Sequence, residues 1–311
     1  MTRKKVTITD VAREAQVSIS TVSRVVNGST AVSPELAARV QRAIKELNYH
    51  PNALARSLRS KSLPSIGVVL PDLNGMFFTQ VFEGIERACA QHGRLAYVAN
   101  SNNDPENEIL YTRQLLNIGV EGIIYIGAFG WEHQDHIVDA CSQGTPIVLI
   151  NREIDACRAD QVLIDREKGM YLATNHLIGL GHRRIGCLAV RTHGGTTSEQ
   201  LDGFHNAMAD AGITSDVDLL MEASPDIQSG VLAAKNMLSS SSPSAVFATS
   251  DTLAIALLHA ASELGISVPL ELSVVGFGDI RISRYVTPPI TTVHQPMEDM
   301  GERAVQLLFE R

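Results

Sequence analysis

Short apolar runs recur along most of the chain, and stretches of helical character, such as residues 77–92 and 105–118, separate them. The runs lie at residues 65–70, 95–99, 122–126, 146–150, 185–190, 245–248 and 272–276. Strands that are apolar on both faces and alternate with helices are typical of parallel sheets that helices cover on both sides. Two lobes fit the length better than one large sheet. The pattern therefore predicts an α/β core of two doubly wound parallel-sheet lobes.

The net charge changes sign just before this core. The first 62 residues hold eleven of the 26 Lys and Arg residues but only four of the 34 Asp and Glu residues, a net charge of +7. The other 249 residues hold fifteen basic and thirty acidic residues, which gives −15 and the total of −8. Because an acidic body is repelled by phosphate, binding to nucleic acid is confined to the basic end.

Three short helices are predicted inside the basic segment. Thr7 and Asp10 have the spacing of a capping box at the start of the first helix. Ser18 caps the second helix, which runs to Val26, and Ser33 caps the third. Two short helices joined by a tight turn, the second polar on its outer face, form a helix-turn-helix. The segment is therefore predicted to be an all-α headpiece, and a solvated basic tail is the weaker interpretation.

The outer face of the second helix has the chemistry of a DNA-reading surface. Its polar residues are Ser18, Ser20, Thr21, Ser23 and Arg24. Small polar side chains let a helix approach the floor of the major groove, and Arg can span two acceptors on guanine or hold a phosphate.

Residues 51–63 are predicted to form a hinge that becomes helical only on DNA, although a plain linker is the alternative. A helix this short is not stable alone in water. Leu54 and Leu58 lie four residues apart, beside Arg56 and Arg59. A leucine inserted between base steps of a widened minor groove kinks the duplex and lets more protein surface reach it.

These segments resemble the DNA-binding headpiece and hinge of the lactose-repressor (LacI/GalR) family. The matching stretches are residues 9–12 (TDVA), 17–27 (VSISTVSRVVN), 47–49 (LNY) and 51–58 (PNALARSL). The resemblance implies that Ile19, Ser20 and Arg24 read bases and that Leu58 is the intercalating leucine. It implies contacts to the DNA backbone for Thr7, Thr21, Ser23, Asn27, Ser33, Tyr49 and Asn52. Ser18 and Arg56 complete the predicted DNA-binding set.

The core also resembles the effector domain of this family, which is similar to periplasmic sugar-binding proteins. The matching stretches include residues 70–72 (LPD), 180–183 (LGHR), 273–277 (SVVGF) and 288–293 (PPITTV). The resemblance implies two lobes that close on a small molecule and a homodimer formed by pairs of lobes. Ligands of open α/β sheets bind beyond the carboxyl ends of the strands. The predicted effector-binding residues are Phe77, Phe78, Asn151, Arg152, Arg191, Gln200, Ser250, Asp251 and Asp279.

Four pocket positions depart from the family pattern. Gln200 stands where many sugar-binding members have Arg, and Ser250 where Asn is usual. Gly278 replaces a common Asp, and Pro225 replaces an aromatic residue that often stacks on the ligand. Losing these groups removes much of the usual bidentate recognition of hydroxyls. The departures favour a sugar acid or another small metabolite over a neutral hexose, with Arg152 and Arg191 as candidate contacts for an anionic group.

Other classes of function find no support in the sequence. There is no G-x-S-x-G or phosphate-binding loop, so no catalytic residues or cofactor are predicted. The four cysteines are far apart, and no metal site is predicted. No apolar run approaches the roughly 20 residues that cross a bilayer, and no export signal precedes the headpiece, so a cytoplasmic protein without membrane contact is expected. Family members usually continue some twenty residues beyond the last predicted helix, where this chain ends.

The sequence thus predicts a DNA-binding transcriptional repressor, not an enzyme, whose affinity for a pseudo-palindromic operator depends on a sugar or sugar acid bound between the lobes. The expected parts are a headpiece (1–50), a hinge (51–63) and a core (64–311), with one lobe at about 64–163 plus 291–311 and the other at 164–290. The alternatives are a constitutive DNA-binding regulator with an unresponsive pocket and, in another class, a sugar-binding receptor.

Overall fold

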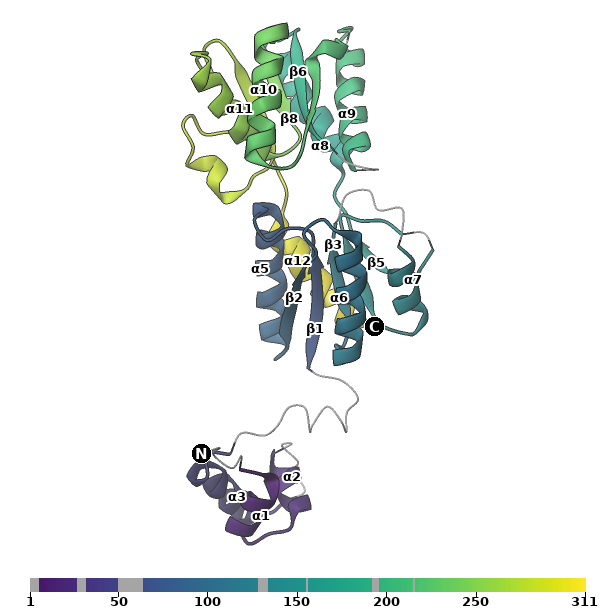
Figure 1. The fold of residues 1–311 in the computed structure, drawn as a ribbon, viewed down its shortest axis with the longest axis vertical. Helices are drawn as coiled ribbons and strands as arrows, with labels where there is room; N and C mark the ends of the chain where they lie inside the picture. The colour runs from purple at the N-terminus through teal and green to yellow at the C-terminus, as the bar shows by residue number, and fades with distance from the viewer. Residues whose placement is uncertain are drawn as a thin grey trace. The chain divides into compact units, whose positions relative to one another are not determined.

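The computed structural model describes residues 6–26, 32–49, 64–127, 134–154, 156–191, 196–214 and 216–311. The chain divides into two compact units, residues 1–63 and 64–311 (Figure 1).

The first unit contains the three predicted helices, α1 (Ile8–Glu14), α2 (Ile19–Val26) and α3 (Pro34–Glu46). The backbone N–H of Thr7 donates to the Asp10 carboxylate at 2.9 Å, and Ser33 Oγ accepts from the N–H of Leu36 at 3.4 Å. Both bonds satisfy groups at helix N-termini, which have no partner inside the helix. Val11, Val22 and Val40, one from each helix, are fully buried and form the centre of a small core.

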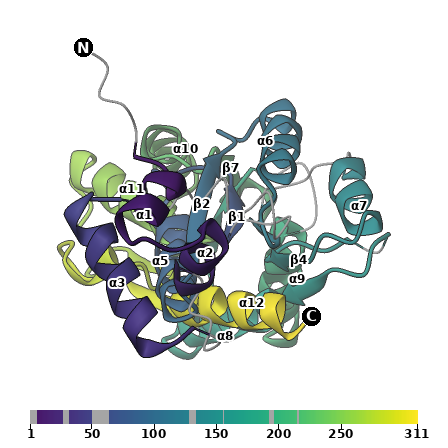
Figure 2. The same cartoon turned by 90° about the horizontal axis from the view of Figure 1, so that it is seen from below.

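The first lobe of the second unit is a five-stranded parallel sheet in the order β2-β1-β3-β4-β5. Its strands are β1 (Ser65–Leu70), β2 (Leu95–Asn100), β3 (Ile123–Ile126), β4 (Ile147–Ile150) and β5 (Asp160–Val162). Helices α5 (Met76–Gln91) and α12 (Met297–Glu310) pack on one face, and α6 (Pro105–Ile118) and α7 (Asp135–Ser142) on the other (Figure 2). Apolar side chains from β1, β3 and β4 point to both faces, which explains their near-continuous apolar runs.

The second lobe is another five-stranded parallel sheet, in the order β10-β9-β8-β6-β7. Its strands are β6 (Ile185–Val190), β7 (Leu220–Ala223), β8 (Ala245–Ala248), β9 (Ser273–Gly278) and β10 (Thr291–His294). Its helices are α8 (Arg166–Gly179), α9 (Thr196–Asp210), α10 (Ile227–Ser241) and α11 (Asp251–Glu263), with short 3-10 turns η1 (Val217–Leu219) and η2 (Arg281–Arg284). The predicted fold class, a helical headpiece with two parallel α/β lobes, is confirmed.

Three strands escaped the sequence analysis, and all three lie at sheet edges. They are β5, β7 and β10, each three or four residues long. They are partly exposed and include polar residues such as Asp160, Glu222 and His294. These three edge strands are short and interrupted by polar residues, so they lack the continuous apolar run that revealed the other strands, including the edge strand β2.

Strand β10 also corrects the expected boundary between the lobes. Residues 291–311 were assigned to the first lobe, but Thr291 to His294 pair with β9 and extend the second sheet. The chain returns to the first lobe only after His294, where α12 packs closely against α5. A Cβ on Gly84 of α5 would lie 2.0 Å from the carbonyl oxygen of Glu298, and one on Gly301 of α12 would lie 2.2 Å from that of Val81. The two helix backbones therefore touch through glycines.

Candidate ligand pocket and DNA-binding surface

A cavity of about 130 Å³ lies between the two sheets of the core. Segments that follow strands of both lobes line it, as expected for the carboxyl ends of parallel strands. The lining residues are Gly75, Met76, Phe77, Phe78, Gly127, Asn151, Arg166, Val190, Gln200, Pro225, Thr249, Ser250, Asp251, Thr252, Phe277, Gly278, Ile280, Gln295 and Met297.

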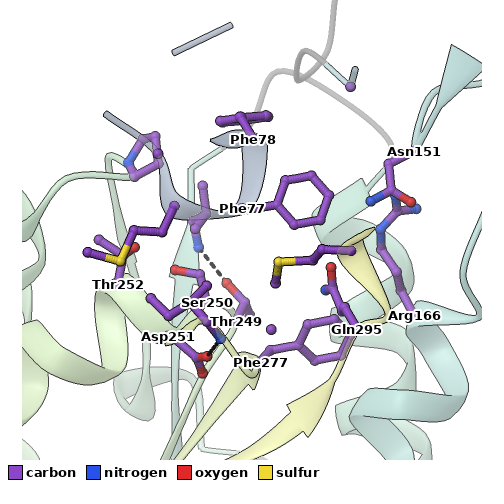
Figure 3. Close-up of a pocket in the computed structure, with 18 of the residues that line it drawn as sticks. Phe77, Phe78, Asn151, Arg166, Thr249, Ser250, Asp251, Thr252, Phe277 and Gln295 are labelled. Carbon is purple, nitrogen blue, oxygen red and sulfur yellow. Dashed lines mark hydrogen bonds between the residues drawn. The ribbon is translucent and has the colours of Figure 1, made fainter. Parts of the chain in front are cut away.

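Two aromatic rings provide the apolar walls of this cavity. Phe77 stands in the first turn of α5 and Phe277 near the end of β9, so one ring comes from each lobe. Figure 3 shows the two rings on opposite sides of the pocket. Phe78 packs edge-on against Phe77 with ring centroids 5.4 Å apart, which holds the Phe77 ring in place. Rings in this arrangement suit a ligand with a compact carbon skeleton.

Asn151 places a buried hydrogen-bond acceptor at the cavity. It follows β4, its backbone φ is +54°, and its side chain is about nine-tenths buried. The backbone N–H donates to the carbonyl oxygen of Val162 at 3.0 Å, which ties the residue to β5. Among the described residues, Asn151 Oδ1 has no hydrogen-bond partner. A buried, unpaired acceptor costs about 1–3 kcal/mol, and a ligand donor in the cavity would remove that cost.

Arg166 lies beside Asn151 and was missed by the sequence analysis. Figure 3 shows its side chain rising from the start of α8 toward the Asn151 amide. The Arg166 side chain is 8% exposed, and its Nη1 donates to Glu199 Oε2 at 3.1 Å. The available signal was its place at the first position of a helix, where the helix dipole disfavours a cation. Because β5 was not recognised in the sequence, it was not apparent that the chain passes from the first lobe to the second just before Arg166.

The wall formed by the second lobe is held by hydrogen bonds within the protein. Gln200 Nε2 donates to the carbonyl oxygen of Thr249 at 3.2 Å, and Thr249 Oγ1 accepts from the N–H of Val190 at 2.8 Å. Ser250 Oγ accepts from the N–H of Leu253 at 3.3 Å and so caps α11. Gln200 and Ser250 thus line the cavity as predicted, with part of their hydrogen-bonding capacity already used.

Asp251 lines the same wall, but its carboxylate is turned into the protein. It is 1% exposed and accepts from the N–H of Ile280 at 2.8 Å and from Thr292 Oγ1 at 2.5 Å. Burial raises the pKa of Asp251 by more than these hydrogen bonds lower it. A Cβ on Gly276 would lie 2.3 Å from Asp251 Oδ1, so β9 approaches this closely only because it carries glycine there. Asp251 therefore shapes the floor of the pocket through the turn after β9.

Three predicted effector contacts do not line the cavity. The Arg152 side chain is 4% exposed and directs Nη1 to both oxygens of Glu108, at 2.9 and 3.1 Å. Arg191, 61% exposed, lies 3.7 Å from Glu222. Asp279 turns outward to Arg284, at 3.0 Å, and His294, at 2.9 Å. Each prediction placed the residue correctly after a strand but missed an oppositely charged partner from another element, which draws the side chain away.

The predicted DNA-binding residues of the headpiece lie mainly on the outer face of α2. Ser18, Ile19, Ser20 and Arg24 are exposed, and Ile19 keeps 46% of its surface in solvent. Ser18 Oγ lies 2.7 Å from Ser20 Oγ, which orders the start of this face. Thr7 and Ser33 are also exposed, whereas Thr21, Ser23 and Tyr49 are half-buried. The predictions for Asn27, Asn52, Arg56 and Leu58 lie outside the described residues.

No group of three or more His, Cys, Asp or Glu side chains that could hold a metal ion occurs among the described residues. In the described segments, no helix combines the length and apolar character needed to span a membrane.

Comparisons with known proteins agree with this architecture. Residues 7–52 match a family model described as bacterial regulatory proteins of the lacI family, and residues 63–311 match one described as periplasmic binding proteins and the sugar-binding domain of the LacI family. The HTH-type transcriptional repressor PurR of Vibrio atlanticus is 34% identical over 98% of this chain and 91% of its own length. The ribose operon repressor of Haemophilus influenzae is 35% identical with the same coverage. The crystal structure of the Lac repressor dimer bound to operator and the anti-inducer ONPF superposes with a TM-score of 0.89, at 29% identity, over 99% of this chain and 92% of that one.

Proposed function

The chain belongs to the lacI family of bacterial regulatory proteins, and from this premise we propose that it is a transcriptional repressor whose affinity for an operator is set by a small metabolite bound between the two lobes. The headpiece supports the DNA-binding part with an exposed polar face on α2. The core supports the sensing part with a cavity to which both lobes contribute.

The single observation that carries the sensing role is the buried Oδ1 of Asn151, which lies beside Arg166 and has no hydrogen-bond partner among the described residues. Asn151 and Arg166 together would bind a ligand that donates a hydrogen bond to Asn151 and presents an acceptor or an anionic group to Arg166. The carbon skeleton of this ligand would lie between Phe77 and Phe277. A sugar or a sugar acid meets these requirements, and a cavity of about 130 Å³ favours a single ring over a disaccharide.

A thermal-shift panel of matched pairs tests this proposal and identifies the class of effector. Full-length protein would be heated with D-glucose and D-gluconate, with D-galactose and D-galacturonate, and with nucleobases. A ligand at about 100 times its Kd stabilises the native state by about 2.7 kcal/mol, which is a measurable rise in Tm. A larger shift for the acid of a pair identifies an anionic effector. A flat response to the whole panel contradicts the proposal that the pocket senses sugars, sugar acids or nucleobases.

Two arginines provide the matched variants for this test. Arg166→Met removes the guanidinium that lines the cavity, and Arg191→Met removes an exposed one that does not. We expect the first variant to abolish the ligand-induced rise in Tm and the second to keep it. An unchanged shift in Arg166→Met would rule out the proposed contact while leaving the function itself open.

We also propose that Ile19, Ser20 and Arg24 read the operator sequence. Their exposure on α2 supports this role, and an arginine that reaches guanine discriminates by about 1–3 kcal/mol. Selection of binding sites from a random DNA library should show relaxed preference for one base pair in Arg24→Ala. The exposed Arg13 of α1 provides the control, and Arg13→Ala should retain the wild-type preference. The same sequence preference in both variants contradicts a reading role for Arg24.

A homodimer is proposed for binding two half-sites of a pseudo-palindrome. The edge strand β2 supports it, because its residues Leu95, Tyr97 and Val98 keep 66%, 39% and 37% of their surface exposed. Apolar exposure on an edge strand is typical of a surface that a second chain covers. Analytical ultracentrifugation should show a dimer for the wild type and a shift toward monomer for Val98→Asp.

A further inference from the structure

One arginine of the second lobe reaches across to two helices of the first. Arg281 is the first residue of η2, directly after Ile280, which lines the cavity. Its guanidinium donates to both oxygens of Glu83 on α5, with Nη1 3.0 Å from Oε1, and its Nη2 lies 2.7 Å from Glu298 Oε1 on α12. One cation therefore joins two carboxylates that would otherwise repel each other.

An uncharged hydrogen bond joins the two lobes at the same place. The backbone N–H of Arg281 donates to Gln80 Oε1 of α5 at 2.9 Å. The amide nitrogen of Gln80 donates in turn to the sulfur of Met297 at 3.3 Å. Met297 and Ile280 both line the cavity. The contacts between the lobes therefore lie immediately behind the pocket, at the point where the chain passes from β10 to α12.

We propose that Arg281, together with Gln80, Glu83 and Glu298, forms a brace that limits rotation of the two lobes about this crossing. Arg281 is in this view a positioning residue, because it acts on the pocket through Ile280 and Met297 and not by touching a ligand. The proposal goes beyond the proposed function and needs neither the effector nor the operator. Because the groups are partly exposed, salt screens their attraction, so the strength of the brace depends on ionic strength.

The chain itself contains a matched control for this proposal. Arg87 of α5 donates to Glu298 at 2.7 Å and also contacts Glu302 of α12. It is exposed like Arg281 and shares one carboxylate with it, but α5 and α12 both belong to the first lobe. Hydrogen bonds from Arg87 and Arg281 lower the pKa of Glu298, so this carboxylate is charged at neutral pH. Loss of Arg87 therefore removes comparable ion pairs without removing a contact between lobes.

The experiment measures the orientation of the lobes in the full-length, ligand-free protein. Genetically encoded spin labels would replace the exposed residues Glu106 of α6 and Gln228 of α10, one on each lobe. Such labels leave the four native cysteines untouched. With the labelled protein diluted in an excess of unlabelled protein, so that a dimer carries one labelled chain, pulsed electron–electron double resonance then gives the distribution of distances between the two lobes of one chain for the wild type, Arg281→Gln and Arg87→Gln. Arg281→Gln keeps the backbone bond to Gln80 and so isolates the role of the guanidinium.

We expect a broader distance distribution in Arg281→Gln and an unchanged one in Arg87→Gln. Salt adds a second criterion, because the screening length falls to about 3 Å at 1 M. High salt should broaden the wild-type distribution toward that of Arg281→Gln and leave the variant unaffected. An unchanged distribution in Arg281→Gln, or equal broadening in Arg87→Gln, would overturn the brace.

Discussion

At the scale of single residues, Asn151 combines a left-handed backbone conformation with a buried side-chain acceptor. Its backbone adopts the left-handed region, which is strained for most residues other than glycine and least so for Asn. Its side-chain oxygen is buried without a partner among the described residues. Strained and unsatisfied groups persist where the surrounding structure holds them, and they cluster at binding sites. Packing alone does not account for the backbone conformation and buried oxygen of Asn151, whereas the proposed role in ligand binding does.

Replacing Asn151 with glycine tests this interpretation. Gly adopts a positive φ without strain and removes the buried oxygen. The greater conformational entropy of Gly in the unfolded chain lowers the free energy of unfolding by about 0.5–1 kcal/mol. We expect urea unfolding to show stability within about 1 kcal/mol of the wild type, and the ligand-induced rise in Tm to disappear. Asn103, in an exposed turn with φ +56°, is the control, because Asn103→Gly makes the same backbone change away from the cavity. Wild-type ligand affinity in Asn151→Gly would contradict the interpretation.

At the scale of elements, the contact between α5 and α12 depends on glycine. Gly301→Ala would push a methyl group into the backbone of α5, where the carbonyl oxygen of Val81 lies 2.2 Å from the new Cβ. Overpacking of this kind costs about 1–3 kcal/mol. Gly179, at the end of α8, has open space around it, and Gly179→Ala should stabilise the protein by up to about 1 kcal/mol. Denaturant melts that show the same sign for both variants would contradict the close approach.

A buried ion pair joins α6 to the loop after β4. Glu108 and Arg152 form a buried ion pair, with side chains 3% and 4% exposed. Removing one partner leaves an uncompensated buried charge, so Glu108→Gln should lose about 3–5 kcal/mol of stability in urea unfolding. The double variant Glu108→Leu, Arg152→Met should recover most of that loss, because apolar residues of similar volume replace such pairs well. A double variant as unstable as the single one would mean that the pair contributes more than compensation of charge.

The same carboxylate predicts how stability changes in acid. Burial raises the pKa of Glu108, but hydrogen bonds from His136 and Arg152 and the charge of Arg152 outweigh it, so the folded pKa lies below the usual range of a glutamate. A group with a lowered folded pKa stabilises the protein fully above its unfolded pKa, and this contribution disappears as pH falls through the folded pKa. Below about pH 4.5 the wild type should therefore lose stability more steeply than Glu108→Gln. Equal slopes in urea titrations at several pH values would contradict the assignment.

At the scale of the whole molecule, the two units have separate hydrophobic cores. Val11, Val22 and Val40 close the core of the headpiece, and none of them belongs to the clusters of the two lobes. Val40→Asp, which buries a charge among apolar residues, should unfold the headpiece. Operator binding should be lost, whereas the core should keep its Tm and its ligand-induced shift in calorimetry. A parallel fall in the Tm of the core would show that the units depend on each other for stability.

Patterns that extend over a few neighbouring residues were sufficient for much of the fold. The apolar runs revealed the central strands because both faces of those strands are buried, and Ser33 and Thr7 marked helix starts because capping involves residues three apart. The edge strands β5, β7 and β10 were missed because they are only three or four residues long and polar residues interrupt them, whereas the edge strand β2 keeps an apolar run. Phe77 and Asn151 were assigned to the pocket because each follows a strand, which is also a local property.

The sequence by itself thus determined the helical headpiece from its caps and charge, and the parallel sheets from their apolar runs. Chain length indicated two lobes, and the ends of the strands indicated the edge at which a ligand is expected. Only the tertiary structure decided which charged groups lie in the cavity. Arg152 turns to Glu108, 44 residues away along the chain, whereas Arg166 reaches the pocket from the start of α8. The brace at Arg281 depends on Glu83, 198 residues away. Electrostatic partners are chosen by distance in space, and the packing of distant elements creates that distance.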